Sequence, residues 1–145
     1  MSDPRSYPDR PYLAVSAAII RDRRVLIVRR ARPPAEGVFT LPGGAVEAGE
    51  RLEEALLREV REETALTIEP IALAGYREVI RRDDAGRVER HFVILAFAAR
   101  WLAGEPVVNA ELTEARWMLP AEIDGLQTTE GLADIVRAAF ACAQP

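Results

Sequence analysis

Residues 43 to 66 read GGAVEAGERLEEALLREVREETAL, and the fold and chemistry of the chain follow from this stretch. The pair Gly43-Gly44 is unfavourable inside a helix or a strand, so it predicts a tight turn. From 51 to 64 the chain has neither Pro nor Gly and consists mostly of good helix formers, which predicts a helix. Glu50 places negative charge beside the first turn of that helix, where the helix dipole favours it.

The predicted helix changes from an apolar to an acidic face along its length. An apolar stripe at helical spacing comes first, formed by Leu52, Ala55 and Leu56. Two turns later the same face carries three carboxylates, those of Glu59, Glu62 and Glu63. Carboxylates on a core-directed face repel one another and lose hydration, and a bound divalent cation relieves both costs. Because every side-chain ligand here is an oxygen, Mg²⁺ or Mn²⁺ fits better than Zn²⁺.

A solvent-exposed helix is the alternative explanation for so many acids. Glu54, Arg58 and Glu62 are spaced for i,i+4 ion pairs, which stabilise an exposed helix without any ligand. The replacement of apolar residues by acids two turns apart favours the metal site over this alternative.

The spacing of these residues resembles the signature of the Nudix hydrolases. The matching positions are Gly44, five residues, Glu50, seven residues, Arg58-Glu59-Val60, one residue and Glu62-Glu63. A pattern of this length and fixed spacing is poorly explained by chance. One position departs, because Ala65 stands where the family usually has Gly, which would end the helix in a left-handed conformation. Ala65 predicts either a strained turn or a different exit of the chain, and it leaves every acid in place.

The resemblance covers nearly all of residues 12 to 141 and implies a fold. We expect an α/β fold, a Nudix-like α/β/α sandwich with a mixed β-sheet between helices. Residues 12–145 form its single domain. Residues 1–11 hold three prolines and several charges, and they predict a flexible N-terminal arm, which can also add to a dimer interface. A homodimer is considered because such folds often pair.

The resemblance also implies roles for individual residues. The expected metal ligands are Gly44, through its carbonyl, and four acids, Glu50, Glu59, Glu62 and Glu63. Glu50 has a second option, the orientation of Arg58, and Glu47 is a weaker candidate at the same loop. Arg58 is expected to fix a glutamate by a charge-assisted hydrogen bond rather than to touch substrate.

The catalytic residues implied by the resemblance are Glu62, Glu59, Arg58 and Glu111. The general base is either Glu62 or an acid from the polar segment 102–113 or just after it. In this second group Glu111 is the first candidate, ahead of Glu105 and Glu114. The alternative for each of the three is a solvent-exposed loop acid without a catalytic role. The sequence does not decide between the two options.

The family hydrolyses a diphosphate that links a nucleoside to another group, with Mg²⁺ or Mn²⁺ as cofactor. The expected substrate is ADP-ribose, cleaved to AMP and ribose 5-phosphate, because the segment VRRARPP before the motif and the chain length are similar to short bacterial ADP-ribose pyrophosphatases. The alternatives are a nucleoside triphosphate or oxidised nucleotide, and a non-catalytic nucleotide sensor. The sensor is disfavoured because this chain keeps every acid of the motif.

Five residues are candidates for substrate binding. They are Arg29, Arg30, Arg32, Phe39 and His91. The arginines either contact substrate phosphate or the acidic helix, or serve solubility. Phe39 is either a core residue or a base-stacking residue, and His91 is either structural or a hydrogen-bond donor to substrate.

Composition narrows the classes of function. The 145 residues are 49% hydrophobic with a net charge of −4, which fits one soluble globular domain and argues against a nucleic-acid partner. The chain has no lysine, which excludes Schiff-base chemistry and a lysine-bearing phosphate loop. One histidine excludes multi-histidine metal sites. The lone Cys142 and the lack of a membrane-length apolar run predict a cytoplasmic protein without a membrane partner.

The remaining elements are predicted from periodicity and turn residues. The expected strands are 12–20, 25–29, 37–41, 66–68, 71–80, 88–101 and 114–119. The strand 88–101 is the most apolar and is expected to be central and covered on both faces. A hairpin around 84–86 would place Val79 and Ile80 opposite 88–90. A last helix, 130–141, is expected to be capped by Thr128 or Thr129.

Overall fold

A computed structural model describes residues 4–31 and 36–144 of the chain. Arg32 and the pair Pro33-Pro34, which the sequence marks as a candidate anion ligand and a rigid break, lie outside the described residues. Tyr7 anchors the N-terminal arm, because its backbone N–H donates to the carbonyl of Glu89 at 2.8 Å and its hydroxyl donates to Asp83 at 2.9 Å.

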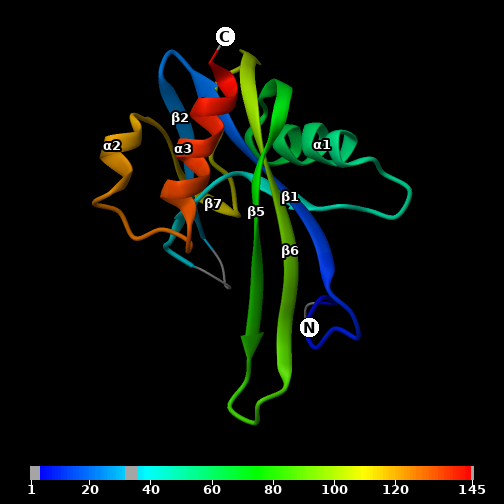
Figure 1. The fold of residues 1–145 in the computed structure, drawn as a ribbon. Helices are drawn as coiled ribbons and strands as arrows, with labels where there is room; N and C mark the ends of the chain where they lie inside the picture. Colours follow the sequence, from blue (N-terminus) through cyan, green and yellow to red (C-terminus); the bar gives the residue numbers. More distant parts are fainter. Residues whose placement is uncertain (1–3, 32–35, 145) are drawn as a thin grey trace.

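The centre of the fold is one mixed β-sheet (Figure 1). Its strands are β1 (Tyr12–Arg21), β2 (Arg24–Arg30), β3 (Phe39–Thr40), β4 (Gly43–Ala45), β5 (Thr67–Arg82), β6 (Val88–Ala103) and β7 (Leu112–Met118). The order along the sheet is β3-β2-β1-β6-β5, with β4 paired to β1 and β7 paired to β2. β1 runs parallel to β6, and the other pairings are antiparallel.

Helices cover both faces of the sheet, as Figure 1 shows. α1 (Leu52–Thr64) lies on one face, whereas α2 (Pro120–Ile123) and α3 (Leu132–Ala143) lie on the other. Each face has its own apolar core, and the strands β1 and β2 contribute to both because their side chains alternate between faces. The α/β/α sandwich with a mixed sheet is therefore confirmed. No described helix is long and apolar enough to cross a membrane.

The α1 helix forms where the sequence predicts it. Ala55 and Leu56 of the apolar stripe are fully buried against the sheet, and Leu52 packs at the edge of the same cluster. At the first turn, the carboxylate of Glu54 accepts the backbone N–H of Arg51 at 3.1 Å, which satisfies one free donor of the helix start.

The prediction of a tight turn at Gly43-Gly44 is wrong. Both glycines lie in β4, with Gly43 opposite Ser16 and Gly44 opposite Val15 of β1, and neither has a positive φ. Glycine is needed there for space. A Cβ at Gly43 would overlap the carbonyl oxygen of Val15, and one at Gly44 would overlap the carboxylate of Glu59.

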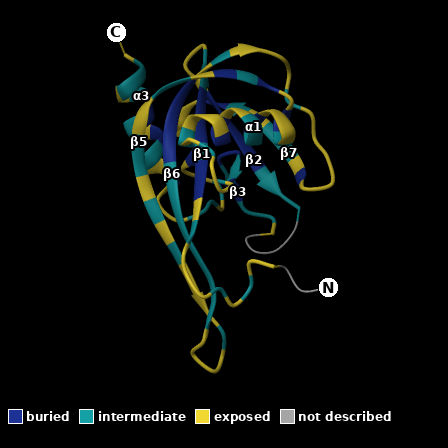
Figure 2. Ribbon diagram, turned by 90° about the vertical axis from the view of Figure 1, so that its right-hand side faces the viewer, coloured by how far each residue is buried: buried dark blue, intermediate teal, exposed yellow. Residues whose placement is uncertain are grey.

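The strands β5 and β6 form a long hairpin that extends beyond the rest of the sheet (Figure 1). The expectation that 88–101 is covered on both faces holds only for 96–99, because residues 88–95 are half-exposed (Figure 2). The register also differs from the prediction. Val79 lies opposite Phe92 and Ile80 opposite His91, because an irregularity between Arg81 and Arg82 shifts the pairing by one residue from the pair Arg82 and Val88.

The prediction that Thr128 or Thr129 caps the last helix is wrong. The N-cap of α3 is Gly131, which has a φ of 79°, and no side chain caps it. The hydroxyl of Thr129 instead hydrogen-bonds that of Thr40 at 3.0 Å, so this threonine joins the connection before α3 to β3.

Ala65 ends α1 in the left-handed conformation that the usual glycine would adopt. Its φ is 67° and its ψ is 13°, and its N–H donates to the carbonyl of Arg61 at 2.9 Å. Of the two outcomes considered for this position, the structure shows the strained turn. An L-residue with a Cβ carries a cost of about 1 kcal/mol in this conformation.

We expect Ala65→Gly to raise the free energy of unfolding by about 0.5–1 kcal/mol, because glycine removes the left-handed strain. Chemical denaturation of the two proteins measures the difference. Ala138→Gly is the matched control, because it places glycine inside α3 and should lower stability by about 1 kcal/mol. Loss of stability in Ala65→Gly would contradict the strain.

Candidate active site

Two acids of α1 point at the strand β4. The backbone N–H of Gly43 donates to the carboxylate of Glu63 at 3.0 Å. The carboxylate of Glu59 occupies the space that a side chain at Gly44 would need. Because Glu59 and Glu63 are one helical turn apart, they lie side by side on the helix face that meets the two glycines.

Arg58 joins the loop before α1 to the acids of the helix. Its Nε and Nη2 donate to the two carboxylate oxygens of Glu50 at 2.7 and 2.8 Å, and Nη1 donates to Glu59 at 2.8 Å. It also reaches Glu62 at 3.3 Å and the carbonyl of Ala45 at 3.1 Å. These contacts raise the pKa of Arg58, and the bidentate pair lowers the pKa of Glu50 to about 2.

The contacts of Glu50 favour one of its two expected roles. Both of its oxygens are engaged by Arg58, and one also accepts the N–H of Glu47 at 2.8 Å. Glu50 therefore orients the guanidinium, whereas its direct binding of a metal stays a prediction.

Glu63 is the acid whose charge is least compensated. Burial raises its pKa to about 7, although the N–H of Gly43 and the charge of Arg30 oppose this rise. The neighbouring charges of Glu59 and Glu111 raise the pKa further. A carboxyl that is removed from water, accepts few hydrogen bonds and has a pKa near 7 would be stabilised in its charged form by a cation.

The three acids do not form the single cluster that the helix spacing predicts. The side chain of Glu62 is 61% exposed, whereas that of Glu59 is 19% exposed. In the described ranges 4–31 and 36–144, no three His, Cys, Asp or Glu side chains come together as a metal-binding group. Arg58 draws Glu59 and Glu62 toward itself, while Glu63 turns to β4.

Neighbouring arginines of β2 point to opposite faces of the sheet. Arg30 lies on the α1 face, where its charge acts on Glu63. Arg29 lies on the other face, where it donates to Glu114 and to the carbonyl of Gly37, each at 3.1 Å. Only Arg30 of this pair is therefore near the acids of α1.

The other candidates for substrate binding lie apart from these contacts. Phe39 is 6% exposed and belongs to the core on the α3 face, with the guanidinium of Arg116 at 5.1 Å from its ring. This burial favours the core alternative for Phe39. His91 lies on β6, opposite Ile80 of the long hairpin. Arg32 is not among the described residues, and its role stays a prediction.

Among the loop acids, Glu111 is the one whose charge reaches the helix acids. Glu105 pairs with Arg21 at 3.0 Å, and Glu114 is held by Arg29 and Arg116. Those two arginines lower the pKa of Glu114. Glu111, by contrast, raises the pKa of Glu63.

Asn109 is a residue of the site that the sequence did not reveal. Its Nδ2 donates to the carbonyl of Glu63 at 2.8 Å, and its Oδ1 accepts the N–H of Glu111 at 2.8 Å and that of Leu112 at 3.2 Å. It thus ties Glu111 to the last turn of α1, where helix carbonyls lack internal partners. The segment around Asn109 also contains Gly104 and Pro106, which signals a turn, but the helix partner of Asn109 is 46 residues away.

The match to a known family follows the same residues. A family model described as the NUDIX domain matches residues 10–139. The chain belongs to the NUDIX family. In a crystal structure of a MutT NUDIX hydrolase from Burkholderia pseudomallei, the similarity covers 90% of this chain and 98% of that one, with a TM-score of 0.79 and 28% identity.

Two relatives differ in the substrate that their names give. An ADP-ribose pyrophosphatase of Methanocaldococcus jannaschii is 36% identical over 107 residues, which are 74% of this chain and 61% of that protein. A nucleoside triphosphatase, NudI, of Salmonella schwarzengrund is 36% identical over 92 residues, 60% of this chain and 65% of that protein. The NUDIX domain of this chain thus spans less than two thirds of either relative.

The residues around Glu63 fit a divalent ion of the kind that NUDIX hydrolases generally need. Every candidate ligand is an oxygen, which suits a hard cation. Glu63 is a buried carboxyl with a raised pKa, and the lack of a side chain at Gly44 gives the carboxylate of Glu59 room beside β4. Glu59 and Glu63 would hold the ion, with Glu62 able to join from the exposed side.

We expect Gly44→Ala to displace the carboxylate of Glu59 and to weaken Mn²⁺ binding by about tenfold or more, with only about 1 kcal/mol lost in stability. Gly43→Ala should instead cost about 3 kcal/mol, because its Cβ meets the rigid backbone of Val15. Paramagnetic resonance titration and chemical denaturation measure the two effects. Unchanged Mn²⁺ affinity in Gly44→Ala would argue against Glu59 as a ligand.

We expect the metal-free protein to lose stability relative to Glu63→Gln as the pH rises. The pKa of Glu63 is about 7 when folded and near its ordinary 4.5 when unfolded, so between these values the folded chain holds the extra proton. Stability then falls with rising pH, by on the order of 2 kcal/mol from pH 4.5 to 7. Urea unfolding in EDTA at several pH values measures this, and parallel curves for both proteins would contradict it.

Proposed function

We propose that this protein is a divalent-metal-dependent hydrolase of a nucleoside diphosphate linked to another group, with ADP-ribose as its substrate and AMP and ribose 5-phosphate as products. The observation that carries the proposal is the pair Glu59 and Glu63, turned from α1 onto the glycine strand β4 with one carboxyl poorly compensated. Family membership and the name of the archaeal relative support the choice of substrate class.

The chain's own residues would divide the work around a diphosphate. Arg58 holds Glu50 and Glu59 in fixed directions, so the acids do not need to reorganise when substrate arrives. Arg30 lies on the same face and supplies a positive charge for a phosphate oxygen. When bound, Mg²⁺ or Mn²⁺ would neutralise the acids and polarise the phosphate, which otherwise repels them.

Two residues compete for the role of general base. Glu62 is exposed and can approach water, but it also contacts Arg58 at 3.3 Å. Asn109 links the backbone of Glu111 to that of Glu63, and the charge of Glu111 raises the pKa of Glu63. Both observations support Glu111 as an acid of the site. A base must lie within hydrogen-bond reach of the water that it activates, and both remain candidates on this criterion.

The second candidate activity is hydrolysis of a nucleoside triphosphate or an oxidised nucleotide. The name of the Salmonella relative, a nucleoside triphosphatase, favours it. A non-catalytic nucleotide sensor has less support, because every acid of the motif is present. A cytoplasmic location, the lack of a nucleic-acid partner and a homodimer also stay part of the proposal.

The deciding experiment is a panel of ADP-ribose, other nucleoside diphosphate sugars, nucleoside triphosphates and 8-oxo-dGTP, each with Mg²⁺ and with Mn²⁺. Release of AMP from ADP-ribose is the expected result, and release of pyrophosphate from triphosphates would select the second activity. Binding of ADP-ribose without any product would mark a sensor. No reaction and no binding with any compound would remove the proposal.

Variants of the helix acids test the site. Glu59→Gln and Glu63→Gln should each lower kcat by about a hundredfold or more while the fold survives. Glu53→Gln is the matched control, because Glu53 is an exposed acid of the same helix and should leave kcat unchanged. Between Glu62→Gln and Glu111→Gln, the larger fall in kcat identifies the base. Normal turnover in both ligand variants would refute the assignment.

A further inference from the structure

The strand β5 forms one edge of the sheet. Among the described residues it pairs only with β6, and it is the last strand in the order β3-β2-β1-β6-β5. The N-terminal arm lies against the other strand of the hairpin, because Tyr7 donates its N–H to Glu89 of β6. The outer edge of β5 therefore presents free backbone donors and acceptors, a template for another strand.

The two halves of this edge differ. In the first half, Pro70 removes a backbone donor, and α3 packs close enough for Ile135 to touch Gly75. The second half, from 76 to 82, extends beyond the helices and has neither Pro nor Gly (Figure 1). Its edge is open to a partner strand.

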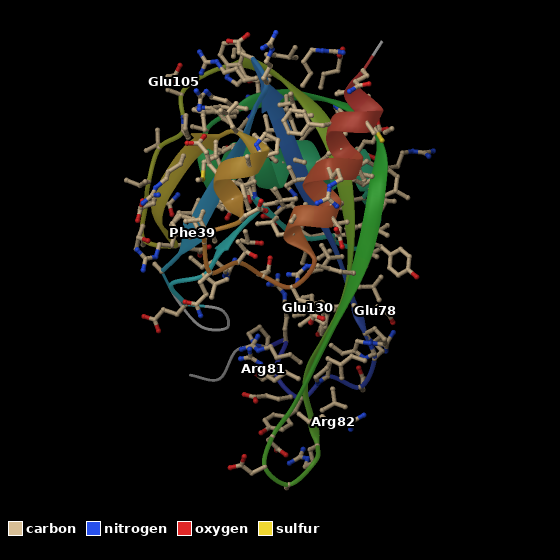
Figure 3. All side chains as sticks on the ribbon, turned by 60° about the vertical axis from the view of Figure 1, so that its left-hand side comes forward. Phe39, Glu78, Arg81, Arg82, Glu105 and Glu130 are labelled. Atoms are coloured by element: carbon tan, nitrogen blue, oxygen red, sulfur yellow. The ribbon has the colours of Figure 1, made fainter. Side chains whose placement is uncertain are left out.

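One face of this second half is exposed and mixed in character. Tyr76 is 64% exposed and Ile80 is 51% exposed, so this face of the strand offers two large apolar side chains to a partner. Glu78 and Arg82 lie on the same face, and Arg81 points to the other side (Figure 3). Within the part of the chain that the structure describes, the carboxylate of Glu78 has no hydrogen-bond or ion-pair partner.

We propose that residues 78–82 of β5 pair antiparallel with the same residues of a second copy of this chain, with Ile80 of each copy beside the two-fold axis. The two sheets then join across their β5 edges. In this arrangement Glu78 of each copy lies opposite Arg82 of the other, so the unpartnered carboxylate gains a partner twice. The two Ile80 side chains cover each other between these ion pairs.

Symmetry and charge select this register. Two strands of one sheet that run antiparallel are related by an axis perpendicular to the sheet, so every side chain keeps its face. Residues that lie opposite each other must therefore be on the same face of the sheet. This requires that the residue nearest the axis lies opposite the same residue of the other copy, rather than opposite its sequence neighbour. Of the centres from 77 to 82, only Ile80 avoids placing two like charges opposite each other, and it pairs Glu78 with Arg82.

Protection of the edge is the competing explanation for these charges. Charged side chains on an edge strand commonly prevent pairing, and like charges placed directly opposite each other repel. Here the signs are mixed and are placed at equal distances on either side of Ile80. This pattern favours self-pairing in one register while it opposes the others.

Charge reversal and its rescue test the proposal. Sedimentation or light scattering over roughly three decades of concentration should show the unmodified chain as a concentration-dependent dimer. Glu78→Arg and Arg82→Glu should each weaken the dimer about tenfold or more, because each turns two attractive pairs into repulsive ones. The double variant, Glu78→Arg with Arg82→Glu, restores opposite charges and should dimerise like the unmodified chain.

Two further measurements keep the test decisive. Glu53→Arg and Arg137→Glu make the same charge changes at exposed positions of α1 and α3 and should leave the dimer unchanged. Ile80→Cys in a Cys142→Ser background should form a disulfide-linked dimer on mild oxidation, because position 80 meets itself across the axis. A monomer at every concentration, or single reversals without effect, or a double variant that fails to recover, would each overturn the proposal.

Discussion

Two half-buried carboxylates between a helix and the backbone of a strand are the constraint on which this structure depends. Glu59 and Glu63 project from α1 onto β4, and each ionised group loses part of its hydration there. The lack of a side chain at Gly44 gives the carboxylate of Glu59 its space, whereas glycine at position 43 is needed for the approach of Val15. Burial raises the pKa of Glu63 to about 7, as it does for acids in general.

The compensation for this burial is uneven. Arg58 donates directly to Glu59, and Glu50 fixes Arg58 with two hydrogen bonds, so this part of the site is complete within the chain. Glu63 receives one backbone N–H and the more distant charge of Arg30, and its pKa remains about 7. The helix therefore has one acid whose charge is balanced by the protein and one whose charged form a cation would stabilise.

Periodicity in the sequence predicted the elements well because it reports directly on burial. Leu56 is buried where the helical stripe requires, and most strands begin and end within a few residues of their expected bounds. The separate strands expected at 66–68 and 71–80 are one continuous strand, β5, and β4 was not expected as a strand. Patterns with two physical causes gave errors. Gly43-Gly44 signals either a turn or a close backbone approach, and only the position of Val15 distinguishes the two. The role of Asn109 depends on a helix carbonyl far away in sequence, which no local pattern reveals.

The long hairpin, like Glu63, carries a free-energy cost that its contacts within the chain offset only in part. For the hairpin this cost is backbone entropy, whereas for Glu63 it is the burial of charge. The packed core under β6 is limited to residues 96–99, yet β5 and β6 continue well beyond it, and ordering those residues costs backbone entropy that little burial offsets. A two-stranded ribbon is marginal in water on its own. Tyr7 contacts the hairpin near its tip, at Asp83 and Glu89, which leaves the outer edge of β5 uncovered. A strand from a second copy would make the ribbon part of a continuous sheet and give the exposed Ile80 an apolar contact.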